Sequence, residues 1–226
     1  MQINIQEASI KQYQTPLNTK AHSVDGQHHG VPIYLQKAAA FSALLMLSPI
    51  LLTTIFCILF ESRGNCFFKQ VRVGKYGRHF NMYKFRSMYL KTDKRYQEPM
   101  ASDSDREGVC AKYRNDPRIT KVGSFIRKYS IDELPQLWNI VKGDMLLIGP
   151  RPALVSEVDQ YDELALNRLN GLPGLSGLWQ VSGRADTDFD TQVRLDDDYL
   201  ASQSIWVDIK IVLATIPCVL FAKGAY

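Results

Sequence analysis

The hydrophobic and polar positions divide the chain into a polar start, one long apolar run and a longer mixed region. Residues 1–36 are polar and show no periodicity, which predicts a flexible N-terminal arm. The 23 residues from Ala38 to Phe60 carry no charge, and about 20 apolar residues are enough to span a bilayer. We therefore expect a membrane helix over residues 37–61, followed by a domain over residues 62–226.

Ser48-Pro49 lies at the middle of the apolar run and predicts a break in this helix. Pro49 has no N–H to donate and its ring clashes with the carbonyl of Leu45, so the helix should bend there. The Ser48 hydroxyl can then satisfy a carbonyl that the break leaves free. On composition alone, a kinked helix that spans the bilayer and a bent helix that returns to the same face are equally good interpretations.

Two β-prone runs, residues 66–73 and 80–88, flank a turn bounded by glycines and predict a β-hairpin. Lys84 and Arg86 are two positions apart on the second run and should share a face, which Lys69 from the first run would join. Fixed cations in this arrangement suit a diphosphate, although a solvated strand face has the same pattern.

Residues 89–117 are highly charged without periodicity, and we expect a mobile excursion there. Order should resume after it, and the segment that follows brings Arg118 and Arg127 up to a pair of acids, Asp132 and Glu133.

The stretch 130–143 has apolar residues at helical spacing, namely Leu134, Leu137, Trp138 and Val141. Ser130 and Glu133 fit a capping box, and Pro135 favours a helix start nearby. Gly143 suits the C-terminal end. Asp132 and Glu133 would then lie at a helix N-terminus, where the backbone dipole should keep both ionised at neutral pH. Such a pair can hold a divalent cation and a phosphate, whereas taken alone it is more often two ordinary first-turn acids.

The next segments predict a short buried strand over 144–148 and a stiff turn over 149–152. The two prolines of that turn can aim Arg151 at an anion, although a rigid surface turn explains them equally well. We expect a helix over 153–170, a flexible loop over 171–177 and a brief strand over 178–181.

Two features near the C-terminus allow more than one interpretation. Asp186-Thr-Asp188 resembles the acid-x-acid signature of metal-dependent glycosyltransferases, but the start of a solvated helix explains this acid-rich stretch better. The apolar residues 211–222 are too few to span a bilayer, so they lie either in the membrane interface or in the core.

The distribution of charge along the chain indicates that the protein binds an anionic partner. The net charge of +4 combines +11 over residues 62–130 with −7 over residues 131–226, which points to phosphates, anionic lipid or nucleic acid bound at the basic part. The four cysteines form no C-x-x-C pair and the four histidines complete no ligand set with them, which argues against zinc and against a disulfide framework.

Six motifs, taken in order, resemble those of one known family: FFKQVRVG at 67–74, YKFRSM at 83–88, DPR at 116–118, SIDELPQLWN at 130–139, KGDM at 142–145 and GPRP at 149–152. Over residues 37–226 the chain closely resembles the bacterial sugar transferase family, the monotopic phosphoglycosyl transferases. GLWQVSGR at 177–184 and KGAY at 223–226 look like the form found in enzymes that initiate exopolysaccharide and O-antigen synthesis.

The resemblance implies transfer of a sugar 1-phosphate from a UDP-sugar to polyprenyl (undecaprenyl) phosphate, with release of UMP. This reaction would initiate exopolysaccharide, capsule or O-antigen assembly at the cytoplasmic face of the bacterial inner membrane. Asp132 matches the family's nucleophile, which carries the phosphosugar as an aspartyl intermediate, and Glu133 matches its Mg²⁺-binding partner. The family's re-entrant helix has its break where Ser48-Pro49 stands here.

The expected fold is therefore α/β and helix-rich, with a small β-hairpin, a re-entrant membrane helix and a cytoplasmic catalytic domain with interfacial helices. Asp132 and Glu133 are the candidate catalytic residues and the candidate Mg²⁺ ligands. The candidate substrate-binding residues are the cations and one amide of the motifs: Lys69, Lys84, Arg86, Arg118, Arg127, Arg151, Gln180 and Arg184.

The implied partners are a UDP-sugar, undecaprenyl phosphate and membrane lipid, without nucleic acid. The sequence leaves open which sugar is transferred, which polysaccharide pathway is served and whether the chain forms a homo-oligomer. Two other functions stay open: a membrane-tethered module that binds nucleic acid or anionic lipid through residues 62–130, and a metal-dependent glycosyltransferase that uses Asp186 and Asp188 and releases UDP.

Overall fold

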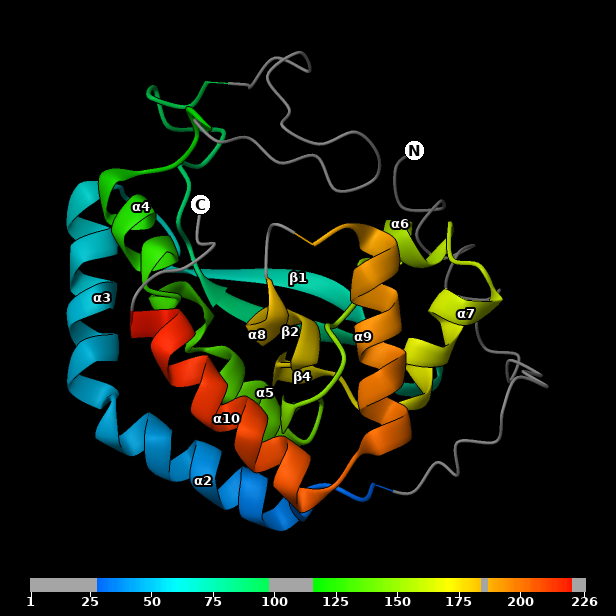
Figure 1. Ribbon diagram of the computed structural model, residues 1–226. Helices are drawn as coiled ribbons and strands as arrows, with labels where there is room; N and C mark the ends of the chain where they lie inside the picture. The colour runs from blue at the N-terminus through cyan, green and yellow to red at the C-terminus, as the bar shows by residue number, and fades with distance from the viewer. Residues whose placement is uncertain (1–27, 98–115, 184–186, 221–226) are drawn as a thin grey trace.

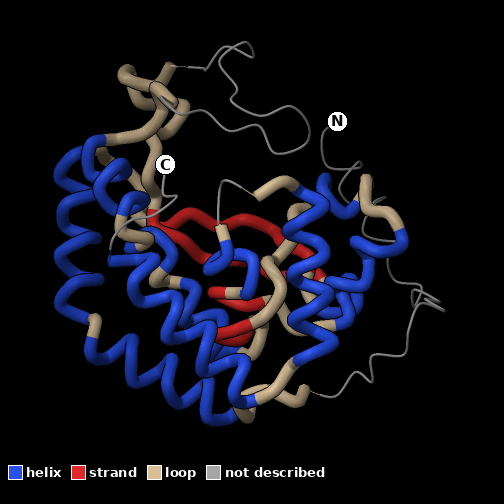
Figure 2. Tube along the Cα trace, viewed as in Figure 1, coloured by secondary structure: helices blue, strands red, loops and turns tan. Residues whose placement is uncertain are grey.

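The computed structural model describes residues 28–97, 116–183 and 187–220 (Figures 1 and 2). Most of the predicted N-terminal arm lies outside these residues, as do most of the predicted excursion, Arg184, Asp186 and the last six residues. Within them the chain is helix-rich and contains two small sheets, each of two strands. The α/β class and the small hairpin are thus confirmed.

The apolar run forms two helices, α2 (Ile33–Met46) and α3 (Ser48–Glu61), with axes bent by 60° at the predicted position. The Ser48 hydroxyl donates to the Leu45 carbonyl at 2.7 Å, as expected for a carbonyl that Pro49 leaves without its helical donor. No single helix in the described parts is long and apolar enough to cross a membrane, but the bent pair together has the length and composition to do so.

The predicted start of this helix at residue 37 is wrong, because α2 begins at Ile33. The prediction used the charge of Lys37 as a boundary, and a charge limits how deep a residue can lie in lipid, not where a helix begins. The helix pair is also not separate from the domain, since Ala40 is fully buried in a core cluster with Met82 and Ile140. Its other face is exposed and apolar, with Phe41, Leu45, Met46, Phe56 and Phe60.

The hairpin consists of β1 (Phe67–Val73) and β2 (His79–Phe85), which pair antiparallel from Phe67 opposite Phe85 to Val73 opposite His79. The turn between them, η1 (Lys75–Gly77), places both Tyr76 and Gly77 at positive φ, which explains the glycine-bounded sequence. This prediction is confirmed.

The central stretch differs from the predicted single helix with a capping box. A 3₁₀ turn, η3 (Ile131–Glu133), precedes α5 (Gln136–Lys142), which begins directly after Pro135. Ser130 is left-handed at φ 55° and makes no side-chain cap bond, whereas a capping serine takes extended backbone angles. The C-terminal prediction is confirmed, since Gly143 is left-handed at φ 91°.

The second sheet pairs β3 (Leu146–Ile148) in parallel with β4 (Gly174–Ser176). The strand predicted over 144–148 is therefore present, but the loop predicted over 171–177 contains a strand. The pairing needs close backbone contact, because a Cβ on Gly174 would lie 2.1 Å from the Gly149 nitrogen. The brief strand predicted over 178–181 is instead helix α8 (Leu178–Ser182).

The helix predicted over 153–170 is broken into α6 (Val155–Val158), α7 (Glu163–Leu166) and η4 (Asn167–Asn170). The apolar spacing is helical, but the Asp162 side chain accepts from the Ala165 amide and starts a new helix in the middle of the run. A polar cap thus overrides the pattern of apolar positions.

Two longer helices complete the fold, α9 (Phe189–Ser202) and α10 (Ile205–Leu220) (Figure 1). Asp188 caps α9 by accepting from the Thr191 amide, which confirms a helix start at this acid. The apolar tail is α10, which buries Asp208 and exposes 74% of Trp206. The Asp208 carboxylate accepts from the Val31 amide at 2.7 Å and from the Tyr199 hydroxyl at 2.8 Å, so it joins the two ends of the described chain.

Candidate active site

One large cavity of about 1450 Å³ lies between the hairpin, the 3₁₀ turn, the Gly149–Pro152 turn, α8 and α10. Most of the predicted site residues line it: Lys84, Arg86, Arg118, Arg127, Asp132, Glu133, Arg151 and Gln180. These residues come from separate segments of the sequence, and the fold brings them to one place.

Asp132 lies half-buried in the wall of this cavity, at the centre of the 3₁₀ turn. Burial and, to a lesser extent, the charge of Glu133 raise the pKa of Asp132 to about 6, against the opposing effect of Lys84 and Arg127. Asp132 is then mostly a carboxylate at pH 7, by about ten to one. The dipole argument for this charge was wrong, because no α-helix begins at Asp132.

Glu133 is held by Lys84 across the cavity wall. The Lys84 ammonium donates to Glu133 Oε1 at 2.7 Å, and both side chains stay partly exposed to the cavity. This contact fixes the 3₁₀ turn against β2 and keeps a cation close to Asp132. Lys84, which the sequence predicted as a cation for an anionic ligand, therefore lies beside the acid pair.

The predicted trio of Lys69, Lys84 and Arg86 does not share one face. Lys69 lies opposite Tyr83 in the hairpin, and Lys84 lies opposite Phe68, so the alternation of the strands directs the two lysines to opposite faces. Arg86 is buried, and its guanidinium donates to the carbonyls of Ser62 and Arg63, which fixes the backbone after α3. Only Lys84 of the three therefore meets the acid pair.

Two further arginines from the segment before Asp132 line the same cavity. Arg118 is held by Asp116, which accepts from its Nε and Nη2 atoms at 2.9 and 2.7 Å. This contact raises the pKa of the Arg118 guanidinium still further, so Arg118 is always charged. Arg127 extends from α4 (Lys121–Lys128) and lowers the pKa values of both Asp116 and Asp132. Arg127 therefore adds a positive charge near the Asp132 carboxylate, whereas the charge of Arg118 is balanced by Asp116.

Arg151 projects from the stiff Gly149–Pro152 turn, and its position is set by buried contacts. Its amide donates to Asp196 Oδ2 at 3.4 Å, and the same oxygen accepts from Nη2 of the buried Arg168 at 2.6 Å. The Arg151 guanidinium lies 3.8 Å from Glu157 Oε1 and over the ring of Trp179. The turn is thus tied to α9 and aims Arg151 into the cavity.

Gln180 also lines the cavity, from α8, and donates to the Leu175 carbonyl at 3.3 Å. Arg184 lies outside the described residues, so its predicted role stays a prediction. The same is true of Asp186, whereas Asp188 is engaged in capping α9.

Sequence reasoning missed the polar residues that hold the site together. Asn139 is completely buried in α5, accepts from the Tyr83 amide, and donates to the Asn81 carbonyl and to Asp144. It thus fixes α5 to β2, but it reads in the sequence as one polar residue between apolar ones. The predicted apolar face of Leu134, Leu137, Trp138 and Val141 points away from Asn139, so only its place in the 130–139 motif singled it out.

The two carboxylates of Asp132 and Glu133 suit Mg²⁺ as part of a site that the phosphates of a substrate would complete. No group of three or more acidic, histidine or cysteine side chains converges in residues 28–97, 116–183 and 187–220, so a cage made of protein ligands is not supported there. Mg²⁺ usually binds through one or two carboxylates and the phosphates of a substrate. Asp132 and Glu133, adjacent in the cavity wall, supply such a pair.

The chain matches one known protein family over most of its length. The model of the bacterial sugar transferase family matches residues 31–222. The galactosyl transferase CpsE of Streptococcus agalactiae is 48% identical over 163 residues, which cover 72% of this chain and 36% of that protein. The exopolysaccharide production protein ExoY of Rhizobium meliloti is 42% identical over 193 residues, covering 83% of this chain and 84% of that protein.

The undecaprenyl-phosphate galactose phosphotransferase of Salmonella typhimurium is 45% identical over 166 residues, which cover 72% of this chain and 35% of that protein. The chain thus spans little more than a third of the Streptococcus and Salmonella proteins and most of the Rhizobium protein. The family match includes the bent helix pair, the hairpin, the acid pair and the stiff turn. The chain therefore belongs to the bacterial sugar transferase family.

Proposed function

We propose that this chain transfers a sugar 1-phosphate from a UDP-sugar to undecaprenyl phosphate through an aspartyl intermediate. The observation that carries the proposal is the half-buried Asp132 carboxylate in a cavity walled by cations from three segments, Lys84, Arg127 and Arg151. Its relatives named as undecaprenyl-phosphate galactose and glucose phosphotransferases support the same chemistry. The product would begin a polysaccharide such as an exopolysaccharide, capsule or O-antigen.

In the first step an Asp132 carboxylate oxygen attacks the phosphorus that bears the sugar. The bond from that phosphorus to the UMP oxygen breaks, and UMP leaves with the electron pair. In the second step a phosphate oxygen of undecaprenyl phosphate attacks the same phosphorus, and the Asp132 carboxylate is regenerated. Because the carboxylate forms a covalent intermediate, the transfer proceeds in two steps at the same phosphorus. The two large substrates can then react one after the other.

The surrounding side chains position charge, which is the main need of phosphoryl transfer. Lys84 holds Glu133 against the hairpin, while Arg127 and Arg118 line the cavity from the segment before Asp132. Mg²⁺ held by Asp132 and Glu133 would neutralise diphosphate charge when the donor binds. Arg151 contributes a further cation to the cavity wall, on a backbone with little freedom to move.

We propose further that the chain is monotopic at the cytoplasmic face of the membrane, with α2 and α3 as a re-entrant pair. The 60° bend, the Ser48–Leu45 hydrogen bond and the exposed apolar residues of the pair support this arrangement. The apolar outer face of α10, with Trp206, would lie in the membrane interface.

The two other functions have less support. A glycosyltransferase that uses Asp186 and Asp188 would need Asp188 as a metal ligand, but this carboxylate caps α9. A module that only binds nucleic acid or anionic lipid would explain the basic residues but not the carboxylate pair among them.

The nucleotide product decides between these functions. Incubation of the purified full chain with undecaprenyl phosphate and a panel of UDP-sugars should release UMP with at least one donor. Release of UDP would assign a glycosyltransferase instead, and no nucleotide release with any donor would leave only the binding module.

The topology is tested by straightening the helix pair. We expect Pro49→Leu to restore the helical hydrogen bond to Leu45, straighten the pair towards a spanning helix and move the N-terminal arm across the membrane. A cysteine at position 19 (Thr19→Cys) should then react with an impermeant maleimide from outside intact cells.

The same cysteine should stay unlabelled in the parent chain and in Leu52→Ile, an apolar exchange on an exposed position of α3. Labelling after permeabilisation serves as the positive control for all three chains. Ready labelling of the parent chain in intact cells would contradict the re-entrant arrangement.

A further inference from the structure

We propose that the hydrocarbon chain of the polyprenyl acceptor lies in the apolar groove between α3 and α4. The inference rests on the proposed function and adds the place where the second substrate binds. The groove has a volume of about 550 Å³, within the range of about 300–1,000 Å³ found for small-molecule sites.

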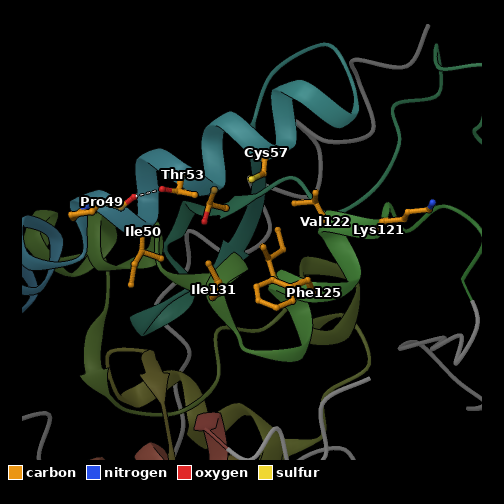
Figure 3. Close-up of a pocket in the computed structure, with 10 residues that line it drawn as sticks. Pro49, Ile50, Thr53, Cys57, Lys121, Val122, Phe125 and Ile131 are labelled. Carbon is orange, nitrogen blue, oxygen red and sulfur yellow. Dashed lines mark hydrogen bonds between the residues drawn. The ribbon is translucent and has the colours of Figure 1, made fainter.

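The groove is built from the inner side of α3 and the facing side of α4. Pro49, Thr53 and Cys57 line it from α3, and Val122 and Phe125 line it from α4 (Figure 3). The Thr53 hydroxyl donates to the Pro49 carbonyl, so its hydrogen-bonding capacity is used within the helix. Thr54 lines the groove as well, so a hydrocarbon chain meets apolar surface and two threonine hydroxyls, of which that of Thr53 is bonded within the helix.

Among the described residues, Lys121 is the only charged residue that lines the groove, and it directs its ammonium away from the other lining side chains (Figure 3). Within that part of the chain, a lipid phosphate therefore finds no cation inside the groove and needs partners elsewhere. The basic cavity around Asp132 supplies them.

The groove and the cavity adjoin each other. Ile50 and Ile131 line both, and Ile131 directly precedes Asp132 in the 3₁₀ turn. A lipid whose phosphate lies beside Asp132 can thus extend its chain past these two isoleucines and between the helices. The position of the groove next to Asp132 favours the reacting polyprenyl acceptor, and not an unreactive membrane lipid, as its occupant.

The width of the groove is fixed by contacts at its end and along its floor. Glu61, the last residue of α3, accepts from the Lys121 and Val122 amides at 2.8 Å each and thereby caps α4. Ile58 and Ile126 pack together as part of a buried cluster beneath the groove. The groove is therefore a property of the packed helices, and not of two loosely placed surface elements.

The first test blocks the groove and measures the two half-reactions separately. In Cys57→Trp the added ring should displace about two CH₂ groups of the lipid's hydrocarbon chain from the groove. This corresponds to roughly a tenfold loss in lipid binding. We expect UMP release without acceptor, in a single turnover, to be retained, and transfer of the adduct to undecaprenyl phosphate to fall by about tenfold or more.

Phe56→Trp is the matched control, because it places the same ring one position earlier on an exposed face of α3 that does not line the groove. It should transfer like the parent. Transfer by Cys57→Trp at the parent rate would overturn the proposal. Loss of the first half-reaction in Cys57→Trp would report misfolding, and the second test then decides.

The second test uses the native thiol of Cys57 and needs no sugar donor. In a Cys66→Ser, Cys110→Ser, Cys218→Ser background, undecaprenyl phosphate should slow the reaction of Cys57 with N-ethylmaleimide several-fold, and geranyl phosphate should slow it less. No protection by undecaprenyl phosphate, or equal protection by phosphatidylglycerol, would overturn the proposal. Failure of the proposed function would appear differently, as absent UMP release in the parent chain.

Discussion

Replacing Asp132 with Asn should abolish the covalent phosphosugar adduct and lower turnover by about 10⁴-fold or more, as expected when a nucleophile is removed. Asn keeps the size of the side chain, but its amide cannot form the acyl phosphate that would carry the phosphosugar. The measurement is UMP release in a single turnover with a radiolabelled UDP-sugar, followed by detection of label on the denatured chain.

The variant should keep its fold, because Asp132 faces the cavity and its burial disfavours the charge that is removed. Asp198→Asn, an exposed acid of α9, is the matched control and should form the adduct at the parent rate. A labelled adduct on Asp132→Asn at the parent level would assign the nucleophile to another residue and contradict the proposed mechanism.

The largest effect on stability is expected for Asp196→Ala. This carboxylate is fully buried and accepts from the buried Arg168 at 2.6 Å, so its removal leaves a cation without its counter-charge in the core. Breaking such a pair costs about 3–5 kcal/mol. For a chain of this size the Tm should fall by roughly 6–20 °C, since each kcal/mol shifts it by about 2–4 °C.

Thermal unfolding of the detergent-purified chain checks this value, with Asp198→Ala as the control on the same helix. The double variant Arg168→Met, Asp196→Leu should recover much of the loss, because apolar residues of similar volume need no counter-charge. A Tm for Asp196→Ala within about 2 °C of the control would contradict this expectation. It would show that water stabilises the charge of Arg168 in place of the carboxylate. Reduced transfer in the double variant would reveal the role of the pair in placing Arg151.

The sequence was sufficient to predict local structure wherever neighbouring residues decide the backbone conformation. The break at Pro49, the hairpin turn and the left-handed Gly143 follow from properties of single residues, and all three are present. The helix predicted over 153–170 failed because one local cap at Asp162 outweighs the apolar spacing, which cannot reveal where a helix restarts.

The site was predictable in its residues but not in its arrangement. Asp132, Lys84 and Arg151 were singled out by type and motif, and all line one cavity. The partners that place them are buried polar residues far away in the chain, such as Asn139 beneath the hairpin and Asp196 behind Arg151. Their roles depend on which segments the fold brings together, and no spacing in the sequence encodes that.

The bond between Val31 and Asp208 sets an order of events during synthesis, because its partners are 177 positions apart. At about 5–20 residues per second, the ribosome needs roughly 10–30 s after α3 to complete α10. Throughout that interval Val31, just before α2, cannot make its final contact with α10. The apolar pair thus leaves the ribosome well before the surfaces that cover its inner face, and we expect lipid or a chaperone to shield that face until synthesis is finished.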